Sequence, residues 1–223
     1  MRLPRLFRRT ERAAEPSGGQ LDYKNAWNRA AREDARDAIL TGSTPESFEA
    51  TGKGDADTVR RYLPERGAVV LNIGCGVGRV EKYLAAHVAE MHAVDVSGEM
   101  IARARERLAG LPNVALREIG NDEFLRGFED GRFDLVFSFL VLQHLSKEDA
   151  FLYLRDAFRV LKPGGVLFVQ FPNLLSPEYT RAFAEGAEVV DRSPGRVRFY
   201  TEVEVRHVLA VAGFQVAELW LSS

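Results

Sequence analysis

The sequence predicts an α/β fold, with a doubly wound, mostly parallel sheet preceded by an N-terminal helical extension. From residue 68 onward, short apolar stretches rich in β-branched residues alternate with amphipathic stretches of helical period. A glycine-rich turn follows the first apolar stretch, as it does in nucleotide-binding sheets. Such alternation favours parallel strands that are covered by helices on both faces.

The composition is that of an ordinary globular protein of 223 residues, with 46% apolar and 28% charged residues. The formal charge of −2 indicates no nucleic-acid partner. No apolar run reaches the ~18 residues that a membrane span needs. Cys75 is the single cysteine, so no intrachain disulfide can form and a cytoplasmic location is favoured.

Residues 1–19 differ from the rest in composition, because they contain five arginines and end in a Pro-Ser-Gly-Gly stretch. We expect these residues to form a flexible basic arm. A weak contact of the arm with a membrane surface is the alternative, since Leu3, Leu6 and Phe7 lie among the arginines.

Residues 20–223 are expected to form a single domain with three parts. The parts are N-terminal helices over 20–64, a ligand-binding sheet core over 65–171, and a lid insert with a last helix and strand over 172–223. Strands are predicted at 68–73, 90–96, 114–119, 133–139, 165–171 and 213–221. Helices are predicted at 21–40, 56–63, 79–90, 98–110, 146–162 and 201–213, with a polar loop at 41–55.

The turn at 74–78, Gly-Cys-Gly-Val-Gly, permits a sharp reversal and close approach of a ligand to the backbone. Asp95 lies 17 residues beyond this turn, at the end of the next predicted strand. An acidic side chain there is placed to accept hydrogen bonds from ribose hydroxyls. A dinucleotide loop would need glycine at position 79, which is arginine, so a nucleoside ligand without a pyrophosphate is favoured.

Five segments, in this order, resemble the motifs of class I S-adenosylmethionine-dependent methyltransferases: VVLNIGCGVGR, AVDVSGEMIARAR, FDLVFSFLVLQHL, LKPGGVLFVQ and TEVEVRHVLAVAGF. The resemblance covers roughly residues 55–221 and implies a Rossmann-like methyltransferase fold with S-adenosylmethionine as methyl donor. It implies transfer of the methyl group to an oxygen or nitrogen of a small-molecule acceptor. A non-catalytic S-adenosylmethionine-binding or regulatory protein and an NAD-binding oxidoreductase are the alternatives.

The resemblance also assigns residues to the donor. The glycine turn would wrap its methionine portion, Asp95 would hold the ribose, and Asn121 would meet the adenine amine. The full predicted donor set is Asn72, Gly74, Cys75, Gly76, Gly78, Asp95, Val96, Met100, Asn121, Asp122, Ser138 and Phe139.

Asn72 departs from the family pattern, which usually has aspartate at this position near the donor's amino group. An amide can still accept a hydrogen bond through its oxygen, but it carries no charge. Loss of a charge-assisted contact weakens affinity on the order of 1–2 kcal/mol.

His144 is the predicted general base, because a neutral imidazole near the methyl group could take a proton from the acceptor. The alternative is a histidine that only shapes the pocket. The predicted acceptor-lining residues are Tyr23, Trp27, Gln143, His144, Tyr179 and Tyr200. No histidine has a second ligand at zinc-binding spacing, so no metal is predicted.

Overall fold

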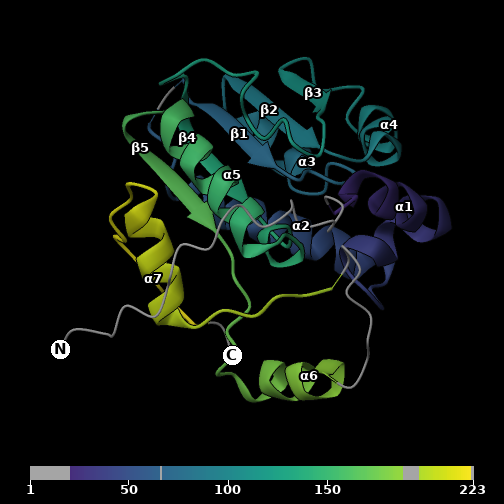
Figure 1. Cartoon of the computed structure of the whole chain (residues 1–223). Helices are drawn as coiled ribbons and strands as arrows, with labels where there is room; N and C mark the ends of the chain where they lie inside the picture. Colours follow the sequence, from purple (N-terminus) through teal and green to yellow (C-terminus); the bar gives the residue numbers. More distant parts are fainter. Residues whose placement is uncertain (1–20, 66, 188–195, 222–223) are drawn as a thin grey trace, which may run out of the picture.

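The computed structural model describes residues 21–65, 67–187 and 196–221, so the predicted arm at 1–19 lies outside the described residues. Its strands are β1 Val69–Ile73, β2 Glu90–Asp95, β3 Val114–Glu118, β4 Phe133–Ser138 and β5 Leu161–Val169 (Figure 1). They form one sheet in the order β3-β2-β1-β4-β5, and every neighbouring pair is parallel. The predicted fold class is confirmed.

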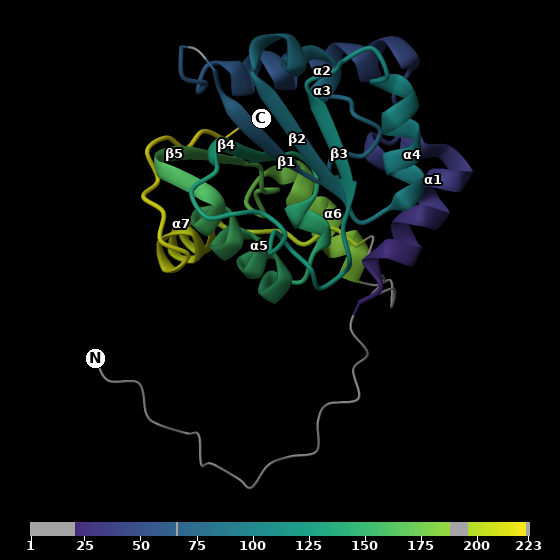
Figure 2. The same cartoon turned by 90° about the horizontal axis from the view of Figure 1, so that it is seen from above.

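Helices cover both faces of this sheet. They are α1 Tyr23–Ile39, α2 Pro45–Arg60, α3 Glu81–Leu84, α4 Gly98–Arg107, α5 Lys147–Val160, α6 Pro177–Ala187 and α7 Glu202–Val211, with 3-10 turns at Ala85–His87 and Leu142–His144. Figure 2 shows α2 and α3 on one side of the sheet and α5 and α7 on the other. Among the described residues, no helix combines the length and apolar character needed to cross a bilayer.

Successive residues of β1 serve the two faces, because side chains alternate along a strand. Val70 is fully buried in the cluster that contains Val59 of α2 and Leu84 of α3. Leu71 is fully buried in the cluster that contains Leu154 of α5. Burial on both faces fixes the register of β1 and with it the position of the turn that follows.

The predicted polar loop at 41–55 is wrong, because α2 begins at Pro45. The Thr44 hydroxyl accepts from the Ser47 amide, and the Ser47 hydroxyl accepts from the Thr44 amide, which makes a capping box. Gly52 indicated a loop but lies inside the helix. A Cβ at Gly52 would lie 2.7 Å from Arg79, so glycine lets α2 approach the turn after β1.

The predicted strand at 213–221 is also wrong, because this segment forms no backbone ladder. Phe214 and Val216 pack against one buried cluster, while the Trp220 ring stacks on Tyr62 with centroids 6.4 Å apart. Trp220 also lies 5.7 Å from the Phe168 ring of β5. Only Phe214 and Val216 keep the period of two that is typical of a strand, because Trp220 is 52% exposed and packs through its ring alone.

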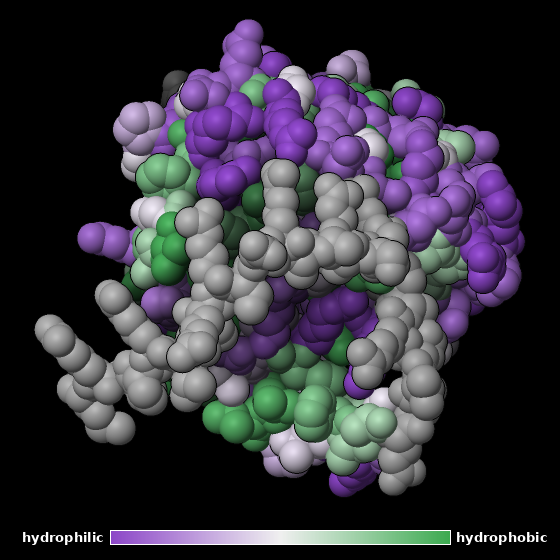
Figure 3. Space-filling view, in the orientation of Figure 1, coloured by the Kyte–Doolittle hydropathy of each residue, from purple (hydrophilic) through white to green (hydrophobic). Residues whose placement is uncertain are grey.

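The lid insert after β5 contains α6, no residue of which is buried. Its chain returns to the domain where the Tyr200 amide donates to Pro172 at 3.0 Å and the Leu174 amide donates to Tyr200 at 2.8 Å. In Figure 1, α6 lies beyond the carboxyl end of β5. The surface over this helix, at the bottom of Figure 3, is largely apolar.

Candidate active site

A cavity lies at the carboxyl ends of β1, β2 and β4, where the strand order reverses between β1 and β4. The structure brings together ten predicted site residues in its walls: Tyr23, Trp27, Asn72, Gly74, Cys75, Gly76, Asp95, Val96, Met100 and Phe139. Residues missed from the sequence include Ile39, Arg79, Val141 and Tyr153.

The turn after β1 can be built only with glycine at its first position. Gly74 has a φ of 77°, and its amide donates to Val94 at 2.8 Å. A Cβ on Gly74 would lie 2.2 Å from a methyl carbon of Val141. The bare backbone therefore lets the turn pass between the ends of β2 and β4.

Gly78 was predicted to contact the donor but does not line the cavity. Its φ is 78°, and a Cβ there would lie 2.5 Å from the Leu108 side chain. The absence of a side chain at Gly78 therefore lets the turn pack against the end of α4.

Asp95 is fixed at the end of β2 by two backbone amides. Its Oδ2 accepts from Gly76 at 2.8 Å, and its Oδ1 accepts from Ser97 at 2.8 Å. Burial raises the pKa of this carboxyl, while the amide donors act to lower it. Each oxygen keeps acceptor capacity, so the carboxylate can bind two hydroxyl groups in the cavity.

Asn72 of β1 lines the cavity and is hydrogen-bonded to Glu81, a residue outside the lining that the sequence analysis did not predict. The Asn72 Nδ2 donates to Glu81 Oε1 at 2.6 Å, and both residues are buried. The Asn72 Oδ1 is also buried and has no hydrogen-bond partner within the described part of the chain. Asn72, one of the residues that line the cavity, thus carries a buried acceptor without a partner.

Arg79, which also lines the cavity, carries a second polar atom without a partner. Its side chain is buried, and its Nη2 pairs with Asp55 of α2 at 2.7 Å. Its Nη1 is buried without a partner among residues 21–65, 67–187 and 196–221. Arg79 can therefore bind an anionic group that enters the cavity.

Glu81 makes the stability of the protein depend on pH. Burial raises its pKa from 4.5 to about 7; Asn72 and Arg79 favour its ionised form, and Asp95 disfavours it. Since the unfolded carboxyl titrates near its ordinary value, the folded protein binds an extra proton between these values and its stability falls as the pH rises through them.

We expect Glu81→Gln to melt several degrees above the wild type at about pH 8, and to differ much less at about pH 5. The ionised Glu81 lowers the stability of the wild type by at most about 3 kcal/mol, since each pKa unit corresponds to ~1.4 kcal/mol, and glutamine removes this destabilisation. Melting curves of the two proteins across this pH range provide the measurement. A difference in melting temperature that is constant with pH would contradict the expected titration of Glu81.

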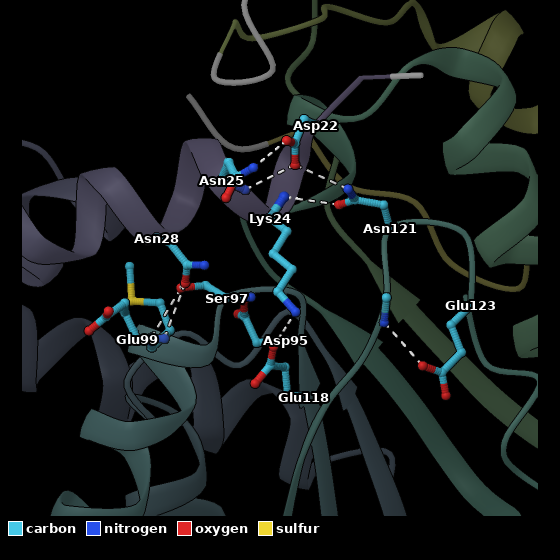
Figure 4. Close-up of polar contacts among 12 residues, drawn as sticks. Asp22, Lys24, Asn25, Asn28, Asp95, Ser97, Glu99, Glu118, Asn121 and Glu123 are labelled. Atoms are coloured by element: carbon cyan, nitrogen blue, oxygen red, sulfur yellow. Dashed lines mark hydrogen bonds and ion pairs between the residues drawn. The ribbon is translucent and has the colours of Figure 1, made fainter. Parts of the chain in front are cut away.

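Besides Gly78, three further predicted donor residues lie outside the cavity. The Ser138 hydroxyl donates to the Ile73 carbonyl at 2.9 Å and ties the ends of β4 and β1. Asn121 contacts the start of α1, where its Oδ1 accepts from the Lys24 amide at 2.9 Å (Figure 4). Asp122 is exposed. A contact of Asn121 or Asp122 with adenine stays a prediction.

Polar contacts hold α1 over the cavity. Asn28 Oδ1 accepts from the Ser97 hydroxyl at 2.8 Å, and Lys24 pairs with Glu118 at 2.5 Å (Figure 4). The Tyr23 hydroxyl accepts from the Ser146 amide at 2.8 Å and so contacts the start of α5. α1 thereby places Tyr23 and its neighbour Trp27 in the cavity wall.

The predicted acceptor residues fall into separate places. His144 lies beside the cavity, with its ring 4.9 Å from the Trp27 ring in an edge-on contact. Gln143 Nε2 lies 3.1 Å from His144 Nε2. Tyr179 instead lines a hollow under α6 with Phe183 and Phe199, and Tyr200 is buried against Phe171.

The Gly-rich turn, Asp95 at the neighbouring strand end and the crossover between β1 and β4 define a nucleoside site in a Rossmann-like sheet. Residues 70–165 match the family model described as "Methyltransferase domain". The chain is 31% identical over 167 residues to a ubiquinone biosynthesis O-methyltransferase from Azorhizobium caulinodans, covering 72% of this chain and 64% of the relative. The corresponding protein from Xanthomonas oryzae pv. oryzae is 30% identical, with 74% and 68% covered.

Among solved structures, magnesium protoporphyrin IX methyltransferase from Synechocystis, with bound SAH, superposes with a TM-score of 0.69. It is 21% identical, and the match covers 90% of this chain and 91% of that one. The chain belongs to the class I S-adenosylmethionine-dependent methyltransferases. The predicted family, enzyme class and methyl donor are confirmed.

The residues present fit this donor. The two unsatisfied atoms in the wall, Asn72 Oδ1 and Arg79 Nη1, are an acceptor and a cationic donor. They complement the ammonium and carboxylate groups of an amino acid. Asp95 complements a ribose diol, and the glycine turn leaves room for a ligand beside the backbone.

Proposed function

We propose that this protein transfers a methyl group from S-adenosylmethionine to an oxygen or nitrogen atom of a small-molecule acceptor. The observation that carries the proposal is the cavity at the strand ends, which joins Asp95 to the unsatisfied atoms of Asn72 and Arg79. The relatives named for ubiquinone biosynthesis and magnesium protoporphyrin IX favour an organic small molecule. The donor supplies an electrophilic methyl group on a sulfonium.

The chain's own residues bind and orient the two substrates. Asp95 holds the ribose, Asn72 accepts from the ammonium and Arg79 pairs with the carboxylate. Tyr23 and Trp27 of α1 close the cavity and exclude water. Alignment of the acceptor with the methyl group then supplies much of the rate enhancement, because the reaction is a single in-line displacement.

The acceptor is proposed to enter beside Trp27 and His144, between the cavity and the lid insert. Arg198 connects these parts, since its amide donates to the Gln143 carbonyl at 2.7 Å and its Nη1 donates to the His144 carbonyl at 2.7 Å. The cytoplasm is the proposed location, because the single Cys75 is free and buried. A nucleic-acid partner is not proposed, given the formal charge of −2.

The proposal is tested in two steps on the full chain. Calorimetric titration should detect binding of S-adenosylmethionine, and formation of S-adenosylhomocysteine should then be followed with a panel of phenols, carboxylic acids and amines. Turnover with one class identifies the acceptor atom. Donor binding without turnover on any class would favour the non-catalytic alternative.

His144→Ala is expected to lower kcat by less than about 10-fold and to raise the KM of the acceptor. The Gln143 Nε2 lies within hydrogen-bond distance of the His144 Nε2, so this ring nitrogen already has a partner within the protein. The ring contact with Trp27 favours a role in shaping the acceptor site. Methyl-transfer rates against pH provide the measurement. A loss of ~100-fold, together with loss of an inflection in the pH profile of the rate, would instead make His144 the base.

A further inference from the structure

Glu81 is a buried carboxylate that lies behind the cavity wall and is not part of it. It is fully buried at the first residue of α3, and its Oε1 accepts from Asn72 Nδ2 at 2.6 Å. Its other oxygen has no hydrogen-bond partner in the described part of the chain. A carboxylate in such surroundings costs stability, so its presence calls for an explanation beyond packing.

The contact between Glu81 and Asn72 sets the direction of the amide. An amide has a donating end and an accepting end, and a carboxylate can pair only with the donating end. Since Glu81 holds the Asn72 Nδ2, the Asn72 Oδ1 is left as the group without a partner at the cavity wall. The rotation of Asn72 is therefore decided by a residue nine positions later in the chain.

The negative charge of Glu81 also suits a donor that carries an ammonium group. Asn72 itself is neutral, and the donor's ammonium carries a positive charge that needs a nearby negative one in a buried site. Two charged side chains act on Glu81: the Arg79 guanidinium after the glycine turn favours its ionised form, and the Asp95 carboxylate at the end of β2 disfavours it. Arg79 is already paired with Asp55, which leaves the Glu81 carboxylate to balance an incoming cation.

We propose that Glu81 is a positioning residue for the methyl donor: it holds the Asn72 amide with its oxygen toward the cavity and supplies, through that amide, the negative charge for the donor's α-ammonium group. The proposal rests on binding of the donor in the cavity. Asn72 and Glu81 together would then supply the hydrogen-bond acceptor and the negative charge that a single aspartate at position 72 of β1 would supply.

The experiment compares two ligands on the full chain by calorimetry: S-adenosylhomocysteine and its analogue without the α-amino group. For Glu81→Gln we expect the Kd of S-adenosylhomocysteine to rise at least about 10-fold. The Kd of the deaminated analogue should change less than about three-fold. The glutamine can still accept from Asn72, so this variant removes the charge and keeps the hydrogen bond.

A second variant moves the charge to the cavity wall. Asn72→Asp combined with Glu81→Gln reverses the pair, because the glutamine amide can donate to the new carboxylate. We expect this double variant to bind S-adenosylhomocysteine within about three-fold of the wild type. Asp134→Asn is the matched control, since Asp134 accepts from the Val69 amide at the opposite end of β1. It should leave the ratio of the two Kd values unchanged.

Equal losses for both ligands in Glu81→Gln would overturn the proposal and make Glu81 structural. A double variant that binds no better than Glu81→Gln would overturn it as well. If the wild type binds the deaminated analogue as tightly as S-adenosylhomocysteine, the amino group has no partner here and the proposal fails while the donor site stands. If the wild type binds neither ligand, the donor assignment itself fails.

Discussion

Replacing Asp95 with alanine is expected to weaken S-adenosylmethionine binding by roughly 10- to 100-fold, about 1–3 kcal/mol. The carboxylate is held by the Gly76 and Ser97 amides with acceptor capacity left over, so its loss leaves the ribose hydroxyls without partners. The Gly76 amide also loses its partner, which loosens the turn. Calorimetric titration of both proteins with the donor provides the measurement.

A donor analogue without the two ribose hydroxyls serves as the control for Asp95→Ala. The wild type should bind this analogue more weakly than it binds the parent donor. Asp95→Ala should bind the analogue about as well as the wild type does, because the hydrogen bonds between Asp95 and the hydroxyls are already absent from the analogue. Similar affinities of the variant and the wild type for the parent donor, within about two-fold, would contradict the ribose assignment.

Replacing Gly74 with alanine is expected to remove about 2–4 kcal/mol of stability and most of the donor affinity. Part of the loss is backbone strain, since a left-handed residue with a Cβ costs roughly 1–2 kcal/mol. The remainder comes from Val141, whose methyl carbon would lie 2.2 Å from the new Cβ. Valine is stiff at χ1, so relief of this contact requires a shift of the segment that follows β4. Urea unfolding and donor titration measure the two effects.

Gly42→Ala is a matched control for this strain. Gly42 has a φ of 72°, close to that of Gly74, but a Cβ there would meet nothing within 4 Å. Gly42→Ala should lower the stability only by the cost of backbone strain and should leave donor binding intact. Combining Gly74→Ala with Val141→Ala should recover part of the lost stability. Equal losses in Gly74→Ala and Gly42→Ala would show that the approach of Val141 is unimportant.

The glycine turn and Asp95 could be predicted because their signals are local. A turn after one strand and an acid at the tip of the next are brought together by parallel pairing, here Ile73 beside Val94. The sheet fixes that proximity whatever the loops do. The donor end of the cavity therefore follows from short sequence patterns.

Residues whose environment is set by distant segments could not be predicted in this way. Asn121 lies in a polar turn, and its partner Lys24 is 97 positions away in the sequence. Glu81 stands in a charged segment that is typical of an exposed helix start, yet the contact with Asn72 places it in the core. No periodicity in either segment distinguishes a buried polar group from a solvated one.

The lid insert marks the other limit. Tyr179 and Tyr200 are both aromatic residues after β5, but one lies in an exposed hollow and the other against Phe171. Aromatic residues are expected to be buried, but their presence in the sequence does not identify the residues that they pack against. The contacts of these two tyrosines are therefore not encoded in a local motif.

The buried Glu81 carboxylate has a consequence for the lifetime of the protein. Burial disfavours the ionised form of Glu81, so the protein without ligand loses stability as the pH rises through about 7. A ligand that binds only the folded state raises stability in proportion to the logarithm of its concentration. On the proposed assignment, the methyl donor is thus also a folding ligand, and the protein without it is the form most exposed to unfolding and proteolysis.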